Sequence, residues 1–105
     1  MPETYLIEFR VKPDRLARFH DLLNGVLDAM RHETTFLNAV LVEDSHDRSR
    51  LVLFETWADG RDVVDVQLQR PYRREWHAAL DDILSEDRRI SIWRPVRADG
   101  ARIDA

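Results

Sequence analysis

The sequence predicts an α+β domain of the ferredoxin-like type, with its elements in the order β-α-β-β-α-β. Two observations lead to this prediction. Apolar residues recur at every second position in four short stretches, and they recur at helical spacing in two longer ones. The helices are expected to cover one face of an antiparallel sheet. The 105 residues suffice for a single domain, which we place at residues 1–98, followed by a polar C-terminal tail at residues 99–105.

The first strand is predicted at residues 4–12, "TYLIEFRVK", where apolar and polar residues alternate. Pro13 and Asp14 then favour the start of a helix, because proline is tolerated in the first turn and an acidic side chain suits that end. The helix is expected to end near Glu33. Its apolar positions follow helical spacing: Leu16, Phe19, Leu23, Val26, Leu27 and Met30.

Two further strands are predicted at residues 36–43 and 51–57. The stretch between them, "DSHDRSR" at residues 44–50, is polar and typical of a turn, so we expect a hairpin with a long loop. The third strand ends in Thr56-Trp57, just before the chain turns at Asp59-Gly60.

A second helical region follows this turn and is predicted to be broken in two. A short first helix is interrupted by Pro71, which lacks the backbone N–H and starts a new helix. The last predicted strand covers residues 88–96, "RRISIWRPV", where apolar and polar residues alternate again.

The face of the sheet away from the helices also carries apolar residues on the first, second and fourth predicted strands. A chain of this length offers nothing further to cover them. We therefore expect a homodimer in which two sheets close into a dimeric α+β barrel.

The composition excludes several classes of site and partner. The net charge is −4 with no basic stripe, which argues against a nucleic-acid partner. The absence of cysteine excludes disulfides and thiolate metal sites, and the four histidines show no metal-ligand spacing. No apolar run is long enough to span a membrane, and the first residues do not have the pattern of a signal peptide, so we expect a cytoplasmic protein.

Several segments together resemble the antibiotic biosynthesis monooxygenase (ABM) domain family, with its quinol monooxygenase-like members. They are the first strand running into "VKP", the hairpin "FLNAVLVEDSHDRSRLVLFETWAD", the segment "LQRPYRREW" and the closing "RRISIWRPVRADG". The resemblance covers about residues 4–98. It implies a dimeric α+β barrel that oxidises phenols, anthrones or quinols with molecular oxygen, without flavin, haem or metal.

The chain departs from the family pattern at three positions. Where many members have Asn in the second strand, this chain has Val40, with Asn38 two residues earlier. Gln67 and Tyr72 stand where quinol monooxygenase-like members often have histidine. Neither side chain is a base near neutral pH, so a histidine base does not carry over from the resemblance.

We expect the substrate to bind in an apolar cavity bounded by aromatic rings, with Trp57, Trp76 and His77 among the contacts. Trp57 has two interpretations, a core residue at a strand end or the wall of this cavity. Trp76 lies one turn from Tyr72, at a spacing that is more often typical of a core pair; the alternative is that both rings line the cavity. His77 lies beside the apolar face and is also explained as a solvated histidine.

Polar candidates complete the predicted site. Asn38 lies inside an apolar strand and bonds either the backbone or a ligand, and Gln67 is within helical reach of inward-facing valines. The predicted catalytic residues are Tyr72, as a donor to a phenolate or quinone oxygen, and His20, as the reserve base. His20 is alternatively a buried structural histidine at the edge of the first helix's apolar stripe.

These inferences predict a cofactor-independent monooxygenase that acts on a small phenolic, quinol or aromatic polyketide substrate with O2. The alternative is a non-catalytic dimeric small-molecule-binding or accessory protein on the same fold, because a fold does not fix a function.

Overall fold

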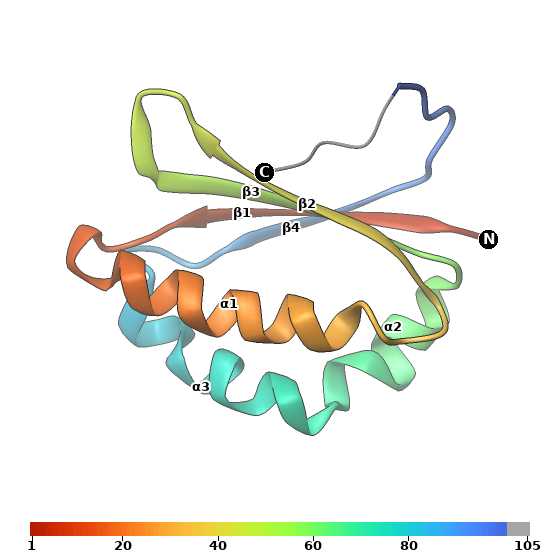
Figure 1. The fold of residues 1–105 in the computed structure, drawn as a ribbon, viewed down its shortest axis with the longest axis horizontal. Helices are drawn as coiled ribbons and strands as arrows, with labels where there is room; N and C mark the ends of the chain where they lie inside the picture. The colour runs from red at the N-terminus through yellow and green to blue at the C-terminus, as the bar shows by residue number, and fades with distance from the viewer. Residues whose placement is uncertain (101–105) are drawn as a thin grey trace.

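A computed structural model describes residues 1–100 and confirms the predicted ferredoxin-like fold, with a four-stranded antiparallel sheet and helices packed on one face (Figure 1). Sheet order is β2-β3-β1-β4, which places the first and third strands at the centre. Residues 101–105 of the predicted tail lie outside the described residues. The principal elements are β1 (Glu3–Arg10), α1 (Leu16–Met30), β2 (Phe36–Asp44), β3 (Asp47–Trp57), α3 (Arg74–Ile83) and β4 (Arg89–Trp93).

The connection between β3 and α3 consists of short helical pieces, as the break at Pro71 predicts. They are α2 (Gly60–Asp65), η2 (Gln67–Gln69) and η3 (Pro71–Arg73), and a similar 3₁₀ turn, η1 (Pro13–Arg15), precedes α1. Asp59 caps α2, since its side chain accepts a hydrogen bond from the Arg61 backbone N–H at 3.0 Å. The pieces lie at one end of the helical layer (Figure 1).

The long loop predicted at residues 44–50 is wrong. β2 and β3 pair as far as Asp44 and Asp47, so Ser45 and His46 alone connect them. Asp44 closes the turn by accepting a hydrogen bond from the His46 backbone N–H at 2.8 Å. The polar residues that suggested a loop lie at the exposed tip of the hairpin, where neither side of the strands is covered by the helices (Figure 1).

Three aromatic rings join the sheet to both long helices. The Phe19 ring stands edge-on to Phe9 with centroids 5.1 Å apart, and Trp76 lies 5.8 Å from Phe9 and 5.6 Å from Phe19. All three side chains are buried, with Phe19 wholly inaccessible to solvent. Such contacts between β1, α1 and α3 fix the distance between the layers.

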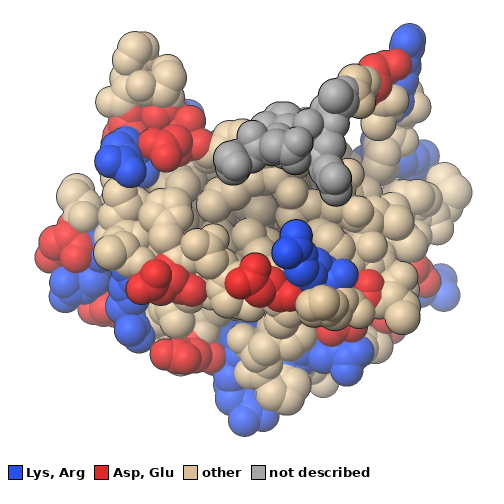
Figure 2. All heavy atoms as spheres, in the orientation of Figure 1, with Lys and Arg blue, Asp and Glu red and all other residues tan. Residues whose placement is uncertain are grey.

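The second face of the sheet is open within residues 1–100 and partly apolar, as the sequence predicts. Cross-strand partners on this face include Leu6, Val40, Val42, Val52 and Phe54. Charged side chains are scattered over the helical layer, whereas the surface along the sheet is mostly uncharged (Figure 2). Among residues 1–100, no helix has the length and apolar character that crossing a bilayer requires.

Truncating Phe19 tests the aromatic junction between the layers. Phe19→Ala is expected to lower the free energy of unfolding by about 3–5 kcal/mol, because it leaves a cavity that Phe9 and Trp76 cannot fill. Urea denaturation followed by tryptophan fluorescence measures the change. The matched control is Val64→Ala on α2, where the side chain is 58% exposed and the expected change is within about 0.5 kcal/mol. Equal losses in both variants would contradict the central role of the junction.

Candidate functional site

A carboxyl group lies beneath the helical layer at the centre of the sheet. Glu55 is 5% exposed and sits between Tyr5 of β1 and Ala39 of β2, on the face that the helices cover. The Trp57 indole Nε1–H donates a hydrogen bond to Glu55 Oε1 at 3.1 Å. Burial raises the pKa of Glu55 above its usual value, although the Trp57 hydrogen bond and two nearby arginines oppose this rise.

One of those arginines is itself buried. Arg73, in η3, is 5% exposed, and its guanidinium lies 6.0 Å from the Trp57 ring centroid and 5.7 Å from that of Tyr72. Its Nε and Nη2 atoms are inaccessible to solvent and have no hydrogen-bond partner among the described residues. Unpaired buried donors of this kind are rare in folded proteins, so these two atoms call for an explanation.

Glu55 and Arg73 both line a small cavity of about 20 Å³ between the sheet and the helices. The third charged residue on its wall is Arg88, from the loop between α3 and β4, and burial lowers the pKa of this guanidinium. The rest of the wall is apolar: Ile7, Phe9, Leu23, Val26, Met30, Leu53 and Trp76. The volume is close to that of a single water molecule, so the expected cavity for a flat aromatic molecule is not open in this conformation.

A cluster of polar side chains, centred on Glu33, lies where the end of α1 meets the helical pieces that precede α3. Glu33 lies after α1, and its carboxylate pairs with Arg70 Nε at 3.1 Å. It also accepts hydrogen bonds from Gln67 Nε2 and the Tyr72 hydroxyl, each at 3.2 Å. Asp62 joins the cluster by accepting from Gln67 Nε2 at 2.9 Å. These contacts hold residues 60–72, which we call the lid segment, against the end of α1.

The lid segment has few other ties to the rest of the protein. Backbone hydrogen bonds of Asp62, Val66, Gln69 and Arg70 run to residues within 59–67, and none of those given for the described residues links the segment's backbone to another element's backbone. Besides the contacts of Glu33, two side chains outside the segment bond to it: the Thr35 hydroxyl donates to Asp62 Oδ2 at 2.5 Å, and the Tyr5 hydroxyl donates weakly to the Gly60 carbonyl at 3.4 Å. Side chains, and Glu33 above all, therefore fix its position.

The structure brings four predicted site residues to this region. Trp57 is fully buried and bonds Glu55, while Gln67 and Tyr72 belong to the Glu33 cluster. Burial raises the pKa of the Tyr72 hydroxyl, which therefore remains a donor. Trp76 reaches the cavity wall and is also part of the aromatic junction, so its two interpretations both apply.

The other three predicted residues lie elsewhere or at the margin. Asn38 is exposed on the open face, where it pairs with Thr56, and not beside the cavity. A register shift between Phe36 and Asn38 causes this. The extra residue at the shift moves the side chains that follow it in β2 to the opposite face from the one that strict alternation predicts. That placement contradicts the expectation that Asn38 points into the pocket.

The two histidines differ in their surroundings. His20 is half-buried on α1, with its ring 5.3 Å from that of Phe19, and it does not line the cavity. His77 is half-buried on α3. The pKa of His77 is lowered by burial and by the charges of Arg88 and Arg73, so its imidazole is neutral at physiological pH. Both of these arginines line the cavity, so His77 lies near it.

Sequence reasoning missed Glu55, Arg73 and Arg88 as members of the site. One signal in the sequence pointed to Glu55. Side chains alternate between the two faces of a strand, and Glu55 shares the face of its neighbours Leu53 and Trp57, which are buried. Arg73 carries no such signal, since it stands in "YRRE" next to an exposed arginine. Charged residues are mostly exposed, so the sequence favours the surface for both arginines.

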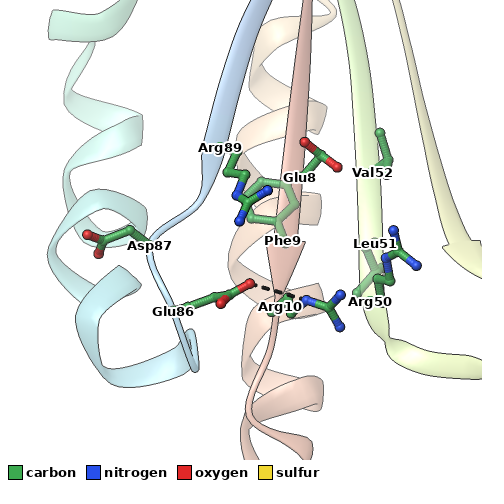
Figure 3. A pocket seen from close by; sticks show the side chains of 9 residues that line it. All are labelled: Glu8, Phe9, Arg10, Arg50, Leu51, Val52, Glu86, Asp87 and Arg89. Carbon is green, nitrogen blue, oxygen red and sulfur yellow. Dashed lines mark ion pairs between the residues drawn. The ribbon is translucent and has the colours of Figure 1, made fainter.

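A larger hollow of about 240 Å³ lies at one end of the open sheet face (Figure 3). Its lining includes three basic residues, Arg10, Arg50 and Arg89, and three acidic ones, Glu8, Glu86 and Asp87 (Figure 3). Arg10 and Glu86 pair at 3.2 Å, with both side chains about half exposed. The mixed, solvated charges favour a surface salt-bridge network over a ligand site.

No group of three or more His, Cys, Asp or Glu side chains within residues 1–100 has the geometry to hold a metal ion. We take the cavity with Glu55, Arg73 and Arg88 as the candidate site, because it combines a carboxyl of raised pKa and two cations with apolar walls.

Solved structures with the same fold include two proteins of bacterial origin. Rv0793 from Mycobacterium tuberculosis superposes with a TM-score of 0.83 over 95% of this chain and 100% of its own, at 21% identity. SnoaB from Streptomyces nogalater, a cofactor-independent oxygenase, gives a TM-score of 0.78 over 92% of this chain and 95% of its own, at 15% identity. At these identities the likeness concerns the fold.

Two sequence comparisons go further. The uncharacterized protein sll1783 of Synechocystis is 27% identical over 85 residues, and the match spans 81% of this chain but 57% of that protein's length. The family model described as antibiotic biosynthesis monooxygenase matches residues 4–79, well over half of the chain. The chain belongs to the antibiotic biosynthesis monooxygenase family.

Proposed function

We propose that the protein is a cofactor-independent monooxygenase that oxidises a small phenolic, quinol or aromatic polyketide substrate with O2. The proposal assigns the activity to the domain at residues 1–98. The observation that carries it is the buried carboxyl of Glu55, held by Trp57 and lying beside an apolar cavity. A carboxyl whose pKa is raised toward neutrality is a more effective general base than an ordinary surface glutamate.

In the proposed reaction Glu55 accepts the proton of the substrate's phenol. Arg73 and Arg88 favour the resulting phenolate electrostatically, because the apolar walls keep water from screening their charges. The phenolate is electron-rich enough to react with O2 directly. In the overall change a ring C–H and the phenol O–H give up their hydrogens, one oxygen atom becomes a new carbonyl group, and the other leaves as water.

The remaining predicted residues have roles in this scheme. Tyr72 is the proposed donor to a substrate oxygen, once its hydroxyl leaves Glu33. Trp57, Gln67, Trp76 and His77 are proposed to contact the substrate. Glu55 replaces His20 as the proposed base, since His20 does not line the cavity.

Substrate binding requires the cavity to widen, because in this conformation it has room for about one water molecule. We propose that the lid segment moves in this step, since it leads directly into Arg73 on the cavity wall. The segment is suited to this motion, since its backbone hydrogen bonds are local and Glu33 supplies most of its external contacts. Lids of this kind open and close on microsecond to millisecond timescales.

We also propose that the open sheet face joins a second copy in a homodimer. Phe54, Val42 and Trp93 are 37%, 41% and 58% exposed, and an apolar hollow of about 340 Å³ lies between Phe54, Leu6 and Trp93. Exposed apolar surface of this extent on one face marks an interface, and closed two-fold dimers are the commonest oligomers.

The first prediction concerns the base. Oxygen uptake with an anthrone or a substituted hydroquinone in air is expected to exceed the buffer rate, and Glu55→Gln is expected to lower it by about 10²–10⁴-fold. The wild-type rate should rise with pH, with its midpoint above the usual Glu pKa of 4.5, as Glu55 loses its proton. Binding of the same compounds without any oxygen uptake would favour the non-catalytic alternative.

A stability measurement checks the same pKa shift independently of activity. The folded protein holds the Glu55 proton to higher pH than the unfolded chain, so stability falls as pH rises from about 4.5 through the raised folded pKa. Glu55→Gln should lose this part of the pH dependence. An unchanged pH profile of stability in the variant would contradict burial of an ionisable carboxyl here.

Loosening the lid is the second prediction. Glu33→Gln removes the charge that pairs with Arg70, and it should speed amide hydrogen exchange in residues 60–72 while the exchange of β1 and β3 amides stays slow. The control is Glu43→Gln, which breaks an exposed 3.5 Å pair with Arg48. Faster exchange throughout the sheet would show that Glu33 supports the whole fold and not the lid alone.

The third prediction concerns the dimer. Phe54→Asp is expected to convert a dimer to a monomer, because it places a charge at the centre of the apolar open face. Sedimentation velocity measures the change, and Val64→Asp, on the exposed side of α2, is the control that leaves the dimer intact. A wild-type protein that is monomeric at micromolar concentration would overturn the proposal.

A further inference from the structure

One edge of the Arg73 guanidinium has no hydrogen-bond partner among residues 1–100. The two nitrogens without a partner, Nε and Nη2, are neighbours on the same side of the planar group, and their N–H bonds point in nearly parallel directions. The side chain is 95% buried, so bulk water does not reach this edge. A pair of parallel buried donors is complementary to two acceptor oxygens of one planar group.

The charges around the cavity also require an anion. Among the described residues that line it, Arg73 and Arg88 are basic and Glu55 alone is acidic. No salt bridge within 4 Å joins Glu55 to either arginine among residues 1–100, and burial raises the pKa of the Glu55 carboxyl, which disfavours its charged form. Two cations therefore face one carboxyl across the cavity, and the buried charge of Arg73 is costly until a ligand supplies a counter-charge.

The walls indicate what carries that anion. Beside the charged groups stand Ile7, Phe9 and Trp76, and the Trp57 and Tyr72 rings lie near the Arg73 guanidinium. Flat apolar walls suit an aromatic ring of a ligand. The edge of a guanidinium suits a carboxylate that is attached to this ring and lies in the plane of the ring. A tetrahedral phosphate also accepts two hydrogen bonds but does not use the aromatic walls.

We propose that the free edge of Arg73 binds a carboxylate of the substrate, with Arg88 adding charge, so that the substrate class is an aromatic carboxylic acid that also bears the oxidisable phenol. This assignment rests on the proposed monooxygenase function for the phenol. The carboxylate pairs with Arg73 while Glu55 receives the phenol proton, so the acid group fixes which hydroxyl faces the base.

Binding of molecules that cannot be oxidised as phenols tests the anchor alone. The probes are 2-naphthoate, its uncharged amide 2-naphthamide, and inorganic phosphate, each titrated by calorimetry at pH 7.5. The wild-type protein is expected to bind 2-naphthoate at least about tenfold more tightly than the amide. In Arg73→Met this preference should fall to about onefold, whereas Arg74→Met, at the exposed neighbouring position, should retain it.

Thermal unfolding of the same proteins separates an anchor from a structural residue. Because Arg73 is buried without a partner, Arg73→Met is expected to unfold at the wild-type temperature or above it, and Arg73→Lys should fold but lose most of the preference. Equal wild-type binding of 2-naphthoate and its amide would overturn the proposal, with or without a folded Arg73→Met. So would phosphate binding as tightly as 2-naphthoate.

Oxygen uptake distinguishes this inference from the function it rests on. 2,5-Dihydroxybenzoate should be oxidised with a lower KM than hydroquinone. Arg73→Met should slow the oxidation of both compounds, because Arg73 also favours the phenolate, but it should raise the KM for 2,5-dihydroxybenzoate by a larger factor than the KM for hydroquinone. Uptake that is equal for both compounds would overturn the anchor and leave the monooxygenase standing. Carboxylate-selective binding that depends on Arg73 without any uptake would refute the monooxygenase and leave the anchor as a binding site for aromatic acids.

Discussion

The burial of charge between sheet and helices is the constraint to which the rest of the molecule is adapted. Glu55 and Arg73 are both 5% exposed, yet neither neutralises the other through a direct ion pair among the described residues. Such an arrangement lowers stability and must be supported elsewhere. The aromatic junction of Phe9, Phe19 and Trp76 supplies that support directly beside the cavity, because it clamps both long helices to the sheet.

The order of the elements was predictable because each one has a periodic apolar pattern, and Pro71 marks the break in the second helical region. The hairpin of β2 and β3 was also predicted, but its short connection was not, since the first residues of β3 are polar on both sides. Strand prediction depends on one covered face, and the hairpin tip has none. Backbone pairing and the Asp44 turn suffice there without an apolar signal.

The site was predictable only where the residue types are themselves informative. Trp57, Gln67 and Tyr72 lie near the candidate site, and they were singled out because large aromatic and amide groups inside apolar patterns require partners; their contact with a substrate stays a prediction. Glu55 and Arg73 were missed because charged residues are expected at the surface, and the partners that bury them come from distant parts of the chain. Asn38 was misplaced by a single extra residue in β2, which no periodicity reveals.

The lid segment has a consequence for how relatives diverge. Its backbone closes hydrogen bonds within itself, so amino-acid replacements at its exposed positions leave the hydrogen bonds of the strand ladder intact. Sequence change can thus accumulate there while the architecture persists, and this chain shares its architecture with SnoaB at 15% identity. In such a scaffold this segment is where substitutions disturb the pairing of the sheet least.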